Sequence, residues 1–441
     1  MSAAVAPAKA AEPVAESAER DAPGLPARGL SLLLRPGTLG IIGQASLSAA
    51  NFLTGVMLGR TCGDDCLGIY ALAMTCVYVG IGIQSELTSG PYHVYCIRRR
   101  GRALHRYTGS VLLHQAVSLA ALLVGIAAVL AVTGQLRELA SVLGVLAVAG
   151  PLLVTREFVR QMTFARLRLR LAVVLDLVAS GVQVGSLAAV WWLGLLSPAT
   201  ALACGASAGV VTIAIWLLRN RRELTLAPRL AWTHWLRNWM FGRWTVATYA
   251  AGSMIPFVMP WALAYWRDSA AVGRLAACNT LIGLSYMFTT GIANALTGQA
   301  ARDYRAGGGD ALMGTLRKAA AIIAGVLGPF LMAVAIAGDW AIAFVYGPDF
   351  AGLGQVSTLI AAGVLAGGLS MVAGNGLWAI ERPQDGLVAD LVTLAVSIVS
   401  AVLLIDRFGV IGAAAATLAG QAASMIVRWA ALRRSLARSD A

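Results

Sequence analysis

Twelve long apolar stretches follow one another between Gly37 and Ala430, and they limit the fold more than any other feature of the sequence. A helix needs roughly 20 predominantly apolar residues to cross the hydrocarbon core of a bilayer. Because no water is available there, each stretch must satisfy its own peptide groups, which a helix does. Hydrophobic residues make up 58% of the chain and charged residues only 12%. The sequence therefore predicts an all-α integral membrane protein with 12 transmembrane helices.

The charge of the loops alternates along the chain and predicts the topology. The expected spans are 37–59, 67–91, 109–132, 139–158, 171–195, 199–218, 242–265, 270–297, 319–346, 355–380, 386–405 and 409–430. Nearly all arginines fall on one side, and the basic residues expected on the other side are Arg60, Arg137, Arg267, Arg274 and Arg407. Cytoplasmic loops of membrane proteins carry the excess of Lys and Arg. We therefore expect both termini in the cytoplasm and a multi-pass protein of the bacterial cytoplasmic (inner) membrane. This topology accounts for the net charge of +13, so nucleic acid is not an expected partner.

The longest basic connection divides the chain into two sets of six spans. It carries Trp232, Trp235 and Trp239 at helical spacing, which is typical of a helix lying in the membrane interface. The alternative is a frayed start to the seventh span. The expected organisation is a disordered cytoplasmic tail over 1–36, a six-helix bundle over 37–218, an interfacial linker helix over 219–241, a second six-helix bundle over 242–430 and a basic cytoplasmic tail over 431–441.

Two smaller features bear on this organisation. Sliding the sequence by 214 residues places Asp176 on Asp390, with Leu and Val following in both halves, which suggests related bundles. Cys62 and Cys66 lie in the short loop after the first span, where an oxidising compartment would permit a disulfide. The sequence does not decide whether that bond forms. No metal site or catalytic residue is expected.

Three short motifs resemble one family of transporters. They are LGR at 58–60 with CLGIYALA at 66–73, REFVR at 156–160 with FAR at 164–166, and FVYGPDF at 344–350. With the topology, they make residues 37–432 similar to the polysaccharide (oligosaccharide) flippase family of the multidrug/oligosaccharidyl-lipid/polysaccharide exporter superfamily. The resemblance implies a MATE-like fold, in which two six-helix bundles surround a cavity that opens alternately to each side. It also implies a lipid-linked glycan as cargo, whose polyprenyl tail stays in lipid.

Charged groups within the spans are functional candidates, because a charge inside the hydrocarbon is costly. Glu86 in the second span is a candidate to bind H⁺ or Na⁺, to pair with an arginine, or to lie at headgroup level in reach of water. Asp176 and Asp390 enter their spans from the cytoplasmic side, where a helix N-terminus also favours an acid for structural reasons. We take these three as candidates for ion coupling. No cofactor is expected.

Arginines at the inner ends of spans are candidates to hold a diphosphate. Guanidinium groups bind phosphate bidentately, which suits Arg156 and Arg160 in the fourth span and Arg243 at the start of the seventh. Glu157 and Arg160 share one helix face and are expected to pair. The alternative is that the topology rule alone places arginines at these positions.

Amides and prolines complete the candidate residues. Asn51, Asn279 and Asn375 lie deep in spans, where interhelical hydrogen bonds are the usual explanation. The family arrangement would instead place them in the cavity, where amides suit sugar hydroxyls. Pro256 and Pro260 predict a bent or broken seventh span, serving either as a static bend or as a hinge.

We therefore predict a transporter, and not an enzyme, that flips polyprenyl-diphosphate-linked oligosaccharide by alternating access for surface polysaccharide biosynthesis. Expected partners are membrane lipids, the lipid-linked glycan and, as an option, the polysaccharide polymerase and export machinery. The alternative on the same fold is a cation-coupled exporter of drugs or metabolites. A membrane polysaccharide polymerase or ligase is less favoured, because every outer loop is short.

Overall fold

The computed structural model describes residues 36–133, 141–225, 228–283 and 285–439, and every regular element in these ranges is helical. The first half contains α2 (Pro36–Gln84), the π-helix η1 (Ser85–Ser89), α3 (Gly90–Cys96), α4 (Gly101–Thr133), α5 (Leu143–Ala165), α6 (Leu169–Trp192), α7 (Pro198–Asn220) and the short η2 (Arg221–Glu223). The second half contains α8 (Pro228–Gly252), α9 (Ile255–Trp266), α10 (Ser269–Gly283), α11 (Tyr286–Tyr346), the short η3 (Pro348–Phe350), α12 (Gly354–Ala379), α13 (Pro383–Phe408) and α14 (Val410–Ser439). The predicted N-terminal tail lies outside these ranges, except for Pro36.

The described helices are compatible with 12 spans, although the predicted eighth span, 270–297, is divided between α10 and the start of α11. Eight of them are long and apolar enough to cross a membrane, and the bent pair α8 and α9 forms a ninth span. Two of the eight are double spans, because the backbone leaves helical geometry at Gly63 inside α2 and at Gly307 and Gly308 inside α11. α5 is the remaining predicted span, and it differs from the eight in carrying two arginines and a glutamate close together.

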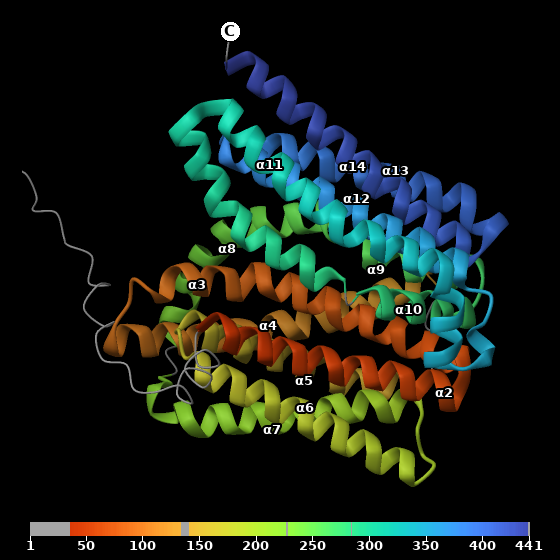
Figure 1. The fold of residues 1–441 in the computed structure, drawn as a ribbon. Helices are drawn as coiled ribbons and strands as arrows, with labels where there is room; N and C mark the ends of the chain where they lie inside the picture. Colours follow the sequence, from red (N-terminus) through yellow and green to blue (C-terminus); the bar gives the residue numbers. More distant parts are fainter. Residues whose placement is uncertain (1–35, 134–140, 226–227, 284, 440–441) are drawn as a thin grey trace, which may run out of the picture.

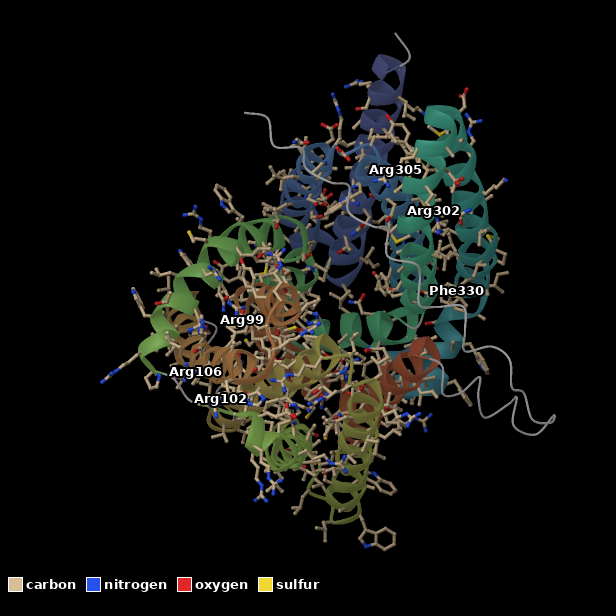
Figure 2. The ribbon with its side chains drawn as sticks, turned by 90° about the vertical axis from the view of Figure 1, so that its left-hand side faces the viewer. Arg99, Arg102, Arg106, Arg302, Arg305 and Phe330 are labelled. Atoms are coloured by element: carbon tan, nitrogen blue, oxygen red, sulfur yellow. The ribbon has the colours of Figure 1, made fainter. Side chains whose placement is uncertain are left out.

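The helices form two bundles, which lie one above the other in Figure 1. α2 to α7 form the first bundle, drawn from red to yellow-green, and α8 to α14 form the second, drawn from green to blue. The arginine-rich turns and the end of α14 lie at one end of both bundles, here called the basic end. Figure 2 labels arginines of this end in each bundle, namely Arg99, Arg102 and Arg106 in the first and Arg302 and Arg305 in the second. The other end, which includes Gly63, is here called the opposite end.

A close helix crossing joins the bundles at the opposite end. Gly68 of α2 lies against α10, where a Cβ atom at Gly68 would come within 1.8 Å of the Ser269 carbonyl oxygen. A Cβ atom at Gly273 would likewise lie 1.9 Å from the Asp64 carbonyl oxygen. Only glycine fits at both positions, because any side chain would push the two helices apart.

Polar contacts reinforce this crossing. Arg274 Nε on α10 donates a hydrogen bond to Asp64 Oδ2 on α2 at 2.8 Å. Arg60 Nε donates to the Val345 carbonyl oxygen at 2.7 Å, which satisfies a carbonyl at the end of α11. Beside Gly63, Cys62 is a free thiol and donates to the Leu196 carbonyl oxygen, and Cys66 is also free. The structure is therefore closed at the opposite end.

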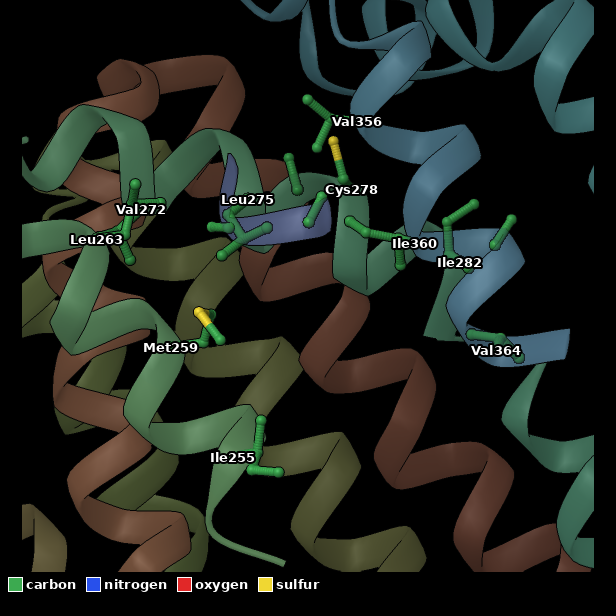
Figure 3. Close-up of a cluster of buried hydrophobic side chains, with 14 of the residues drawn as sticks. Ile255, Met259, Leu263, Val272, Leu275, Cys278, Ile282, Val356, Ile360 and Val364 are labelled. Atoms are coloured by element: carbon green, nitrogen blue, oxygen red, sulfur yellow. The ribbon is translucent and has the colours of Figure 1, made fainter. Parts of the chain in front are cut away.

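Apolar side chains of α9, α10 and α12 form the core of this region (Figure 3). The residues labelled in Figure 3 are Ile255, Met259, Leu263, Val272, Leu275, Cys278, Ile282, Val356, Ile360 and Val364. Because lipid tails are as apolar as these side chains, close packing holds such helices together more than water exclusion does.

The seventh span is bent, as its two prolines predict. α8 and α9 meet at 51°, and the break lies just before Pro256. Pro256 occupies the first turn of α9, where its missing N–H group costs little, and Pro260 lies within α9. α8 itself runs unbroken through most of the predicted interfacial helix and on to Gly252. Its placement in the interface stays a prediction, as does hinge motion at the bend.

α8 is held against the first bundle at the basic end. Tyr107 of α4 donates a hydrogen bond to Asn238 Oδ1 at 3.0 Å, and His234 Nδ1 lies 2.9 Å from Ser110 Oγ. At the same end, Glu223 binds Arg166 and Arg168, each at 2.7 Å. Burial alone would raise the pKa of Glu223, but the two guanidinium groups outweigh it and lower that pKa.

Candidate functional site

A polar cavity of about 360 Å³ lies inside the first bundle. Both halves of α2 line it, together with α5, α6 and α7. Its polar lining residues are Gln44, Ser48, Asn51, Tyr70, Tyr78, Arg156, Glu157, Arg160 and Gln183. Polar side chains from several spans converge here within otherwise apolar helices, which is the usual signature of a functional site in a membrane protein.

Arg160 is fully engaged by acceptors inside the bundle. Its Nε donates to Asp176 Oδ1 and Oδ2 at 3.0 and 3.2 Å, and its Nη1 donates to Glu157 Oε1 at 3.1 Å. Its Nη2 donates to Gln44 Oε1 at 2.9 Å. The predicted pairing of Glu157 with Arg160 is confirmed. Arg160 therefore ties α5 to α6 and α2.

Asp176 is the most enclosed member of this network. Its side chain is 4% exposed, and it points from α6 toward α2. A Cβ atom at Gly43 of α2 would lie 2.4 Å from Asp176 Oδ2, so any side chain there would displace the carboxylate. A buried carboxylate without a partner is strongly destabilising, and Arg160 supplies that partner.

Arg156 lines the same cavity one turn earlier on α5, and its situation is different. Within the described ranges its guanidinium forms no hydrogen bond or ion pair, although it lies in the field of Glu157 and Asp176. A half-buried guanidinium with unused donors is suited to an anion. Among the described cavity residues, Arg156 is the cation available to a ligand.

Amides extend the polar surface away from the arginines. Gln183 Nε2 of α6 donates to Asn51 Oδ1 and to Thr54 Oγ1, both at 3.2 Å. Asn51 is an exposed residue of α2 and lines the cavity. The cavity thus offers a cation at one position and amide groups at another.

The second bundle contains a matching carboxylate pair. Asp390 on α13 accepts a hydrogen bond from Arg428 Nη2 on α14 at 2.5 Å. The 214-residue offset that aligns Asp176 with Asp390 also aligns Arg160 with Gly374 on α12. A Cβ atom at Gly374 would lie 3.2 Å from Arg428 Nη1, so the glycine leaves room for that arginine. Both bundles therefore neutralise the equivalent aspartate, using arginines from different helices.

In each bundle, a glycine on the first helix also packs against the aspartate. Gly43 lies against Asp176, and Gly252 at the end of α8 lies against Asp390, with 3.1 Å between the Asp390 carboxyl group and a Cβ atom built on Gly252. Nearby in the second bundle, Asn375 Oδ1 accepts a hydrogen bond from Thr297 at 2.7 Å.

The remaining predicted residues lie apart from the cavity. Asn279 is on an exposed face of α10. Arg243 is exposed on α8, and its guanidinium lies 5.4 Å from the Trp244 ring. Glu86 sits in η1, where the backbone departs from α-helical geometry. These three residues, and the prolines of α9, are not among the residues that line the polar cavity.

Sequence reasoning missed three members of these networks, which are Gln44, Gly43 and Arg428. A signal was available for Arg428, because it lies within the last apolar stretch and not beyond it. Gln44 is likewise a polar side chain inside the first stretch. The role of Gly43 depends on contact with another helix, and no local pattern reveals it.

Comparisons with known proteins define the fold. No protein-family model and no curated protein matches the sequence. Among solved structures, the chain is similar to the lipid II flippase MurJ in an inward closed conformation, with 13% identity, a TM-score of 0.71 and coverage of 90% of this chain and 87% of that one. It is also similar to an inward-facing multidrug resistance MATE family transporter of the MOP superfamily, with 15% identity, a TM-score of 0.72 and coverage of 90% and 98%. The chain therefore has the MATE-like fold of that superfamily.

The chain is also similar to a structure of this fold in another conformation. An outward-facing MATE family transporter gives a TM-score of 0.56, with 14% identity and coverage of 92% of this chain and 95% of that one.

Proposed function

We propose that this protein is a membrane transporter that flips a polyprenyl-diphosphate-linked oligosaccharide across the bacterial cytoplasmic membrane by alternating access. The observation that carries the proposal is the free guanidinium of Arg156 in a cavity that also presents amide groups. A guanidinium matches a diphosphate, and amides match sugar hydroxyls. The fold supplies the two bundles that such a cycle requires.

The charges of the cavity favour an anionic cargo over a cationic one. An exporter of cationic drugs needs a carboxylate that is free to meet its substrate. Here Asp176 and Glu157 are bound by Arg160, and Asp390 is bound by Arg428. Among the described residues of the polar cavity, the charge without a partner is Arg156, which attracts anions and repels cations.

The orientation follows from the same charges. The basic end faces the cytoplasm under the positive-inside rule, so closure of the opposite end makes this the inward-facing state. The cargo enters at the basic end and leaves after the contacts between α2 and α10 open. Membrane lipids are direct partners, and a polysaccharide polymerase with its export machinery would receive the flipped glycan.

The coupling ion depends on which carboxylates are free. Asp176 and Asp390 each hold a guanidinium in this state, so neither offers an empty cation site. Glu86 is the predicted ion-coupling residue outside these two pairs, and it lies in η1 apart from the polar cavity, so the proposed cycle does not depend on the binding of H⁺ or Na⁺.

Lipid-linked glycan in a deletion strain tests this function. Its leaflet is assigned with an impermeant glycan-modifying reagent, after complementation with wild type, Arg156→Ala or Arg156→Lys. We expect cytoplasmic accumulation in the deletion strain, rescue by wild type, no rescue by Arg156→Ala and partial rescue by Arg156→Lys, which keeps the charge but not the bidentate geometry.

Arg302→Ala is the matched control, because Arg302 is an exposed arginine at the basic end of the other bundle. It removes one charge without touching the cavity and should rescue fully. Normal glycan export in the deletion strain would overturn the proposal. Resistance to cationic dyes that disappears on deletion would support the exporter instead.

A further inference from the structure

A second cavity, here called the apolar crevice, lies on the other side of α2. It measures about 840 Å³ and is enclosed by the second half of α2, α4, α8 and α9. Its lining is almost entirely apolar and includes Ile83, Leu119, Trp235, Trp239, Phe257 and Trp261. Such a volume is typical of a ligand site, and nothing in the polar cavity explains it.

The apolar crevice opens toward the hydrocarbon of the membrane. Val117, Val258 and Tyr265 line it and are 65%, 42% and 66% exposed, so its rim lies on the outer surface of the bundles. An apolar surface of this shape at membrane depth is filled by a hydrocarbon chain and not by water. The occupant therefore comes from the lipid phase.

The second half of α2 is the wall shared by the crevice and the polar cavity. Val77, Tyr78 and Ile81 face the polar cavity, while Val79 and Ile83 face the crevice. The Tyr78 ring lies 6.1 Å from the ring of Phe257, which lines the crevice on α9. The two sites therefore lie on opposite faces of α2 and approach each other at this ring pair.

Aromatic rings distinguish this crevice from an ordinary lipid-facing groove. Trp235 and Trp239 stack at 6.2 Å on α8, and Trp261 adds a third indole from α9. Trp261 Nε1 donates to Thr75 Oγ1 at 2.7 Å, which satisfies its polar atom and leaves the ring for apolar contact. Rigid ring faces suit the methyl-branched, unsaturated units of an isoprenoid chain.

The floor of the crevice is formed by the last residue of α2 and by the π-helix η1 that follows it. Gln84 and Leu87 line it at η1, and π-helical turns of this kind are frequent at functional sites. Gln84 and Gln115 are 3% and 2% exposed, yet Gln84 Oε1 and Gln115 Nε2 have no hydrogen-bond partner among the described residues. The second span therefore lines two different sites, the polar cavity on one face and the apolar crevice on the other.

From these observations, we infer that the apolar crevice holds the polyprenyl chain of the cargo while its diphosphate and sugars occupy the polar cavity. The inference rests on the proposed function and names the part of the substrate that the polar cavity cannot take. Because α2 and α4 belong to the first bundle and α8 and α9 to the second, the chain would lie across the junction between them.

Binding to the full-length protein in nanodiscs tests the inference. The probes are a radiolabelled polyprenyl diphosphate and inorganic pyrophosphate, which carries the head group alone. Gly125 lines the crevice, and nothing lies within 4 Å of a Cβ atom built there, so Gly125→Phe introduces a ring at the crevice wall from a position where a Cβ atom fits. We expect Gly125→Phe to weaken polyprenyl diphosphate binding about tenfold and to leave pyrophosphate binding unchanged.

Gly144→Phe is the matched control, because Gly144 is exposed on α5, has the same free space and does not line the crevice. It should bind both probes as wild type does. Wild-type affinity of Gly125→Phe for the polyprenyl probe would overturn the inference. So would equal displacement of that probe by phosphatidylglycerol, which would make the crevice a general lipid site.

Arg156→Ala separates this inference from the proposed function. Weaker binding of both probes to Arg156→Ala, with no effect of Gly125→Phe, would keep the diphosphate site and remove the crevice. Failure of the wild-type protein to bind either probe would overturn both proposals.

Discussion

At the scale of single residues, two arginines one turn apart on α5 have different roles. Arg160 donates hydrogen bonds to Asp176, Glu157 and Gln44, whereas Arg156 lines the cavity without a partner among the described residues. The pairing of Glu157 with Arg160 could be predicted, because residues three apart share a helix face. The contact with Asp176 could not, since it joins two helices. Without knowledge of that contact, Arg156 and Arg160 are equivalent candidates to bind an anion.

This difference predicts that substitution of Arg160 destabilises the protein, whereas substitution of Arg156 does not. Arg160→Ala would leave the nearly buried Asp176 without its partner, and losses of this kind cost about 3–5 kcal/mol. We expect Arg160→Ala to lower the thermal unfolding temperature of the purified protein in detergent, and Arg156→Ala to leave it near the wild-type value.

The double variant Arg160→Ala/Asp176→Asn serves as the control, because it removes both charges of the pair. It should recover much of the lost stability. Equal unfolding temperatures for Arg160→Ala and Arg156→Ala would contradict the assigned roles.

At the scale of helices, hydropathy predicted the spans, but it did not predict how they join. Apolar runs of about 20 residues give span positions directly. The turn between the first two spans depends on Gly63, whose φ of +83° lets the chain reverse between helical segments. α8 continues through a less apolar segment because hydrogen bonds from α4 hold it, as at Asn238. Contacts of this kind leave no periodic signal in the sequence.

The crossing of α2 and α10 predicts a conformational effect. Gly68→Val cannot keep the observed closure, because its side chain would meet the Ser269 carbonyl group. We expect this variant to populate a state that is more open at the opposite end. Spin labels at Thr61→Cys and Ala351→Cys, in a background without native cysteines, should report a longer distance by double electron–electron resonance.

Gly181→Val is the comparison for this experiment, because Gly181 on α6 has free space around it. It should give the wild-type distance distribution. An unchanged distribution in Gly68→Val would show that the glycine crossing does not control closure.

At the scale of the whole molecule, two bundles carry the same internal neutralisation of charge. The repeat offset predicted the equivalence of Asp176 and Asp390, and the structure places each beside an arginine and a glycine. The offset could not predict that Asp390 pairs with Arg428 and not with a residue at the position equivalent to Arg160. Gly374 stands at the position equivalent to Arg160, and its role becomes clear only from the structure, in which α12 and α14 lie side by side.

The balance of charges inside the first bundle affects the electrical work of the transport cycle. The polar cavity and its surroundings contain two arginines and two carboxylates, namely Arg156, Arg160, Glu157 and Asp176, so the empty transporter carries no net charge there. Outward movement of an anionic head group is then favoured by a membrane potential that is negative inside, by about 2.3 kcal/mol per charge per 100 mV. In proteoliposomes, valinomycin with a potassium gradient should speed or slow flipping according to the sign of the potential.

A proton gradient imposed without a potential should have little effect on that rate, and the opposite result would instead indicate a carboxylate that titrates during the cycle. The neutral empty carrier would return without electrical work, because it moves no charge of its own. The direction of transport would then be set by the charge of the cargo and the sign of the membrane potential. A cell that lost its potential would stop exporting even with the protein and its cargo intact.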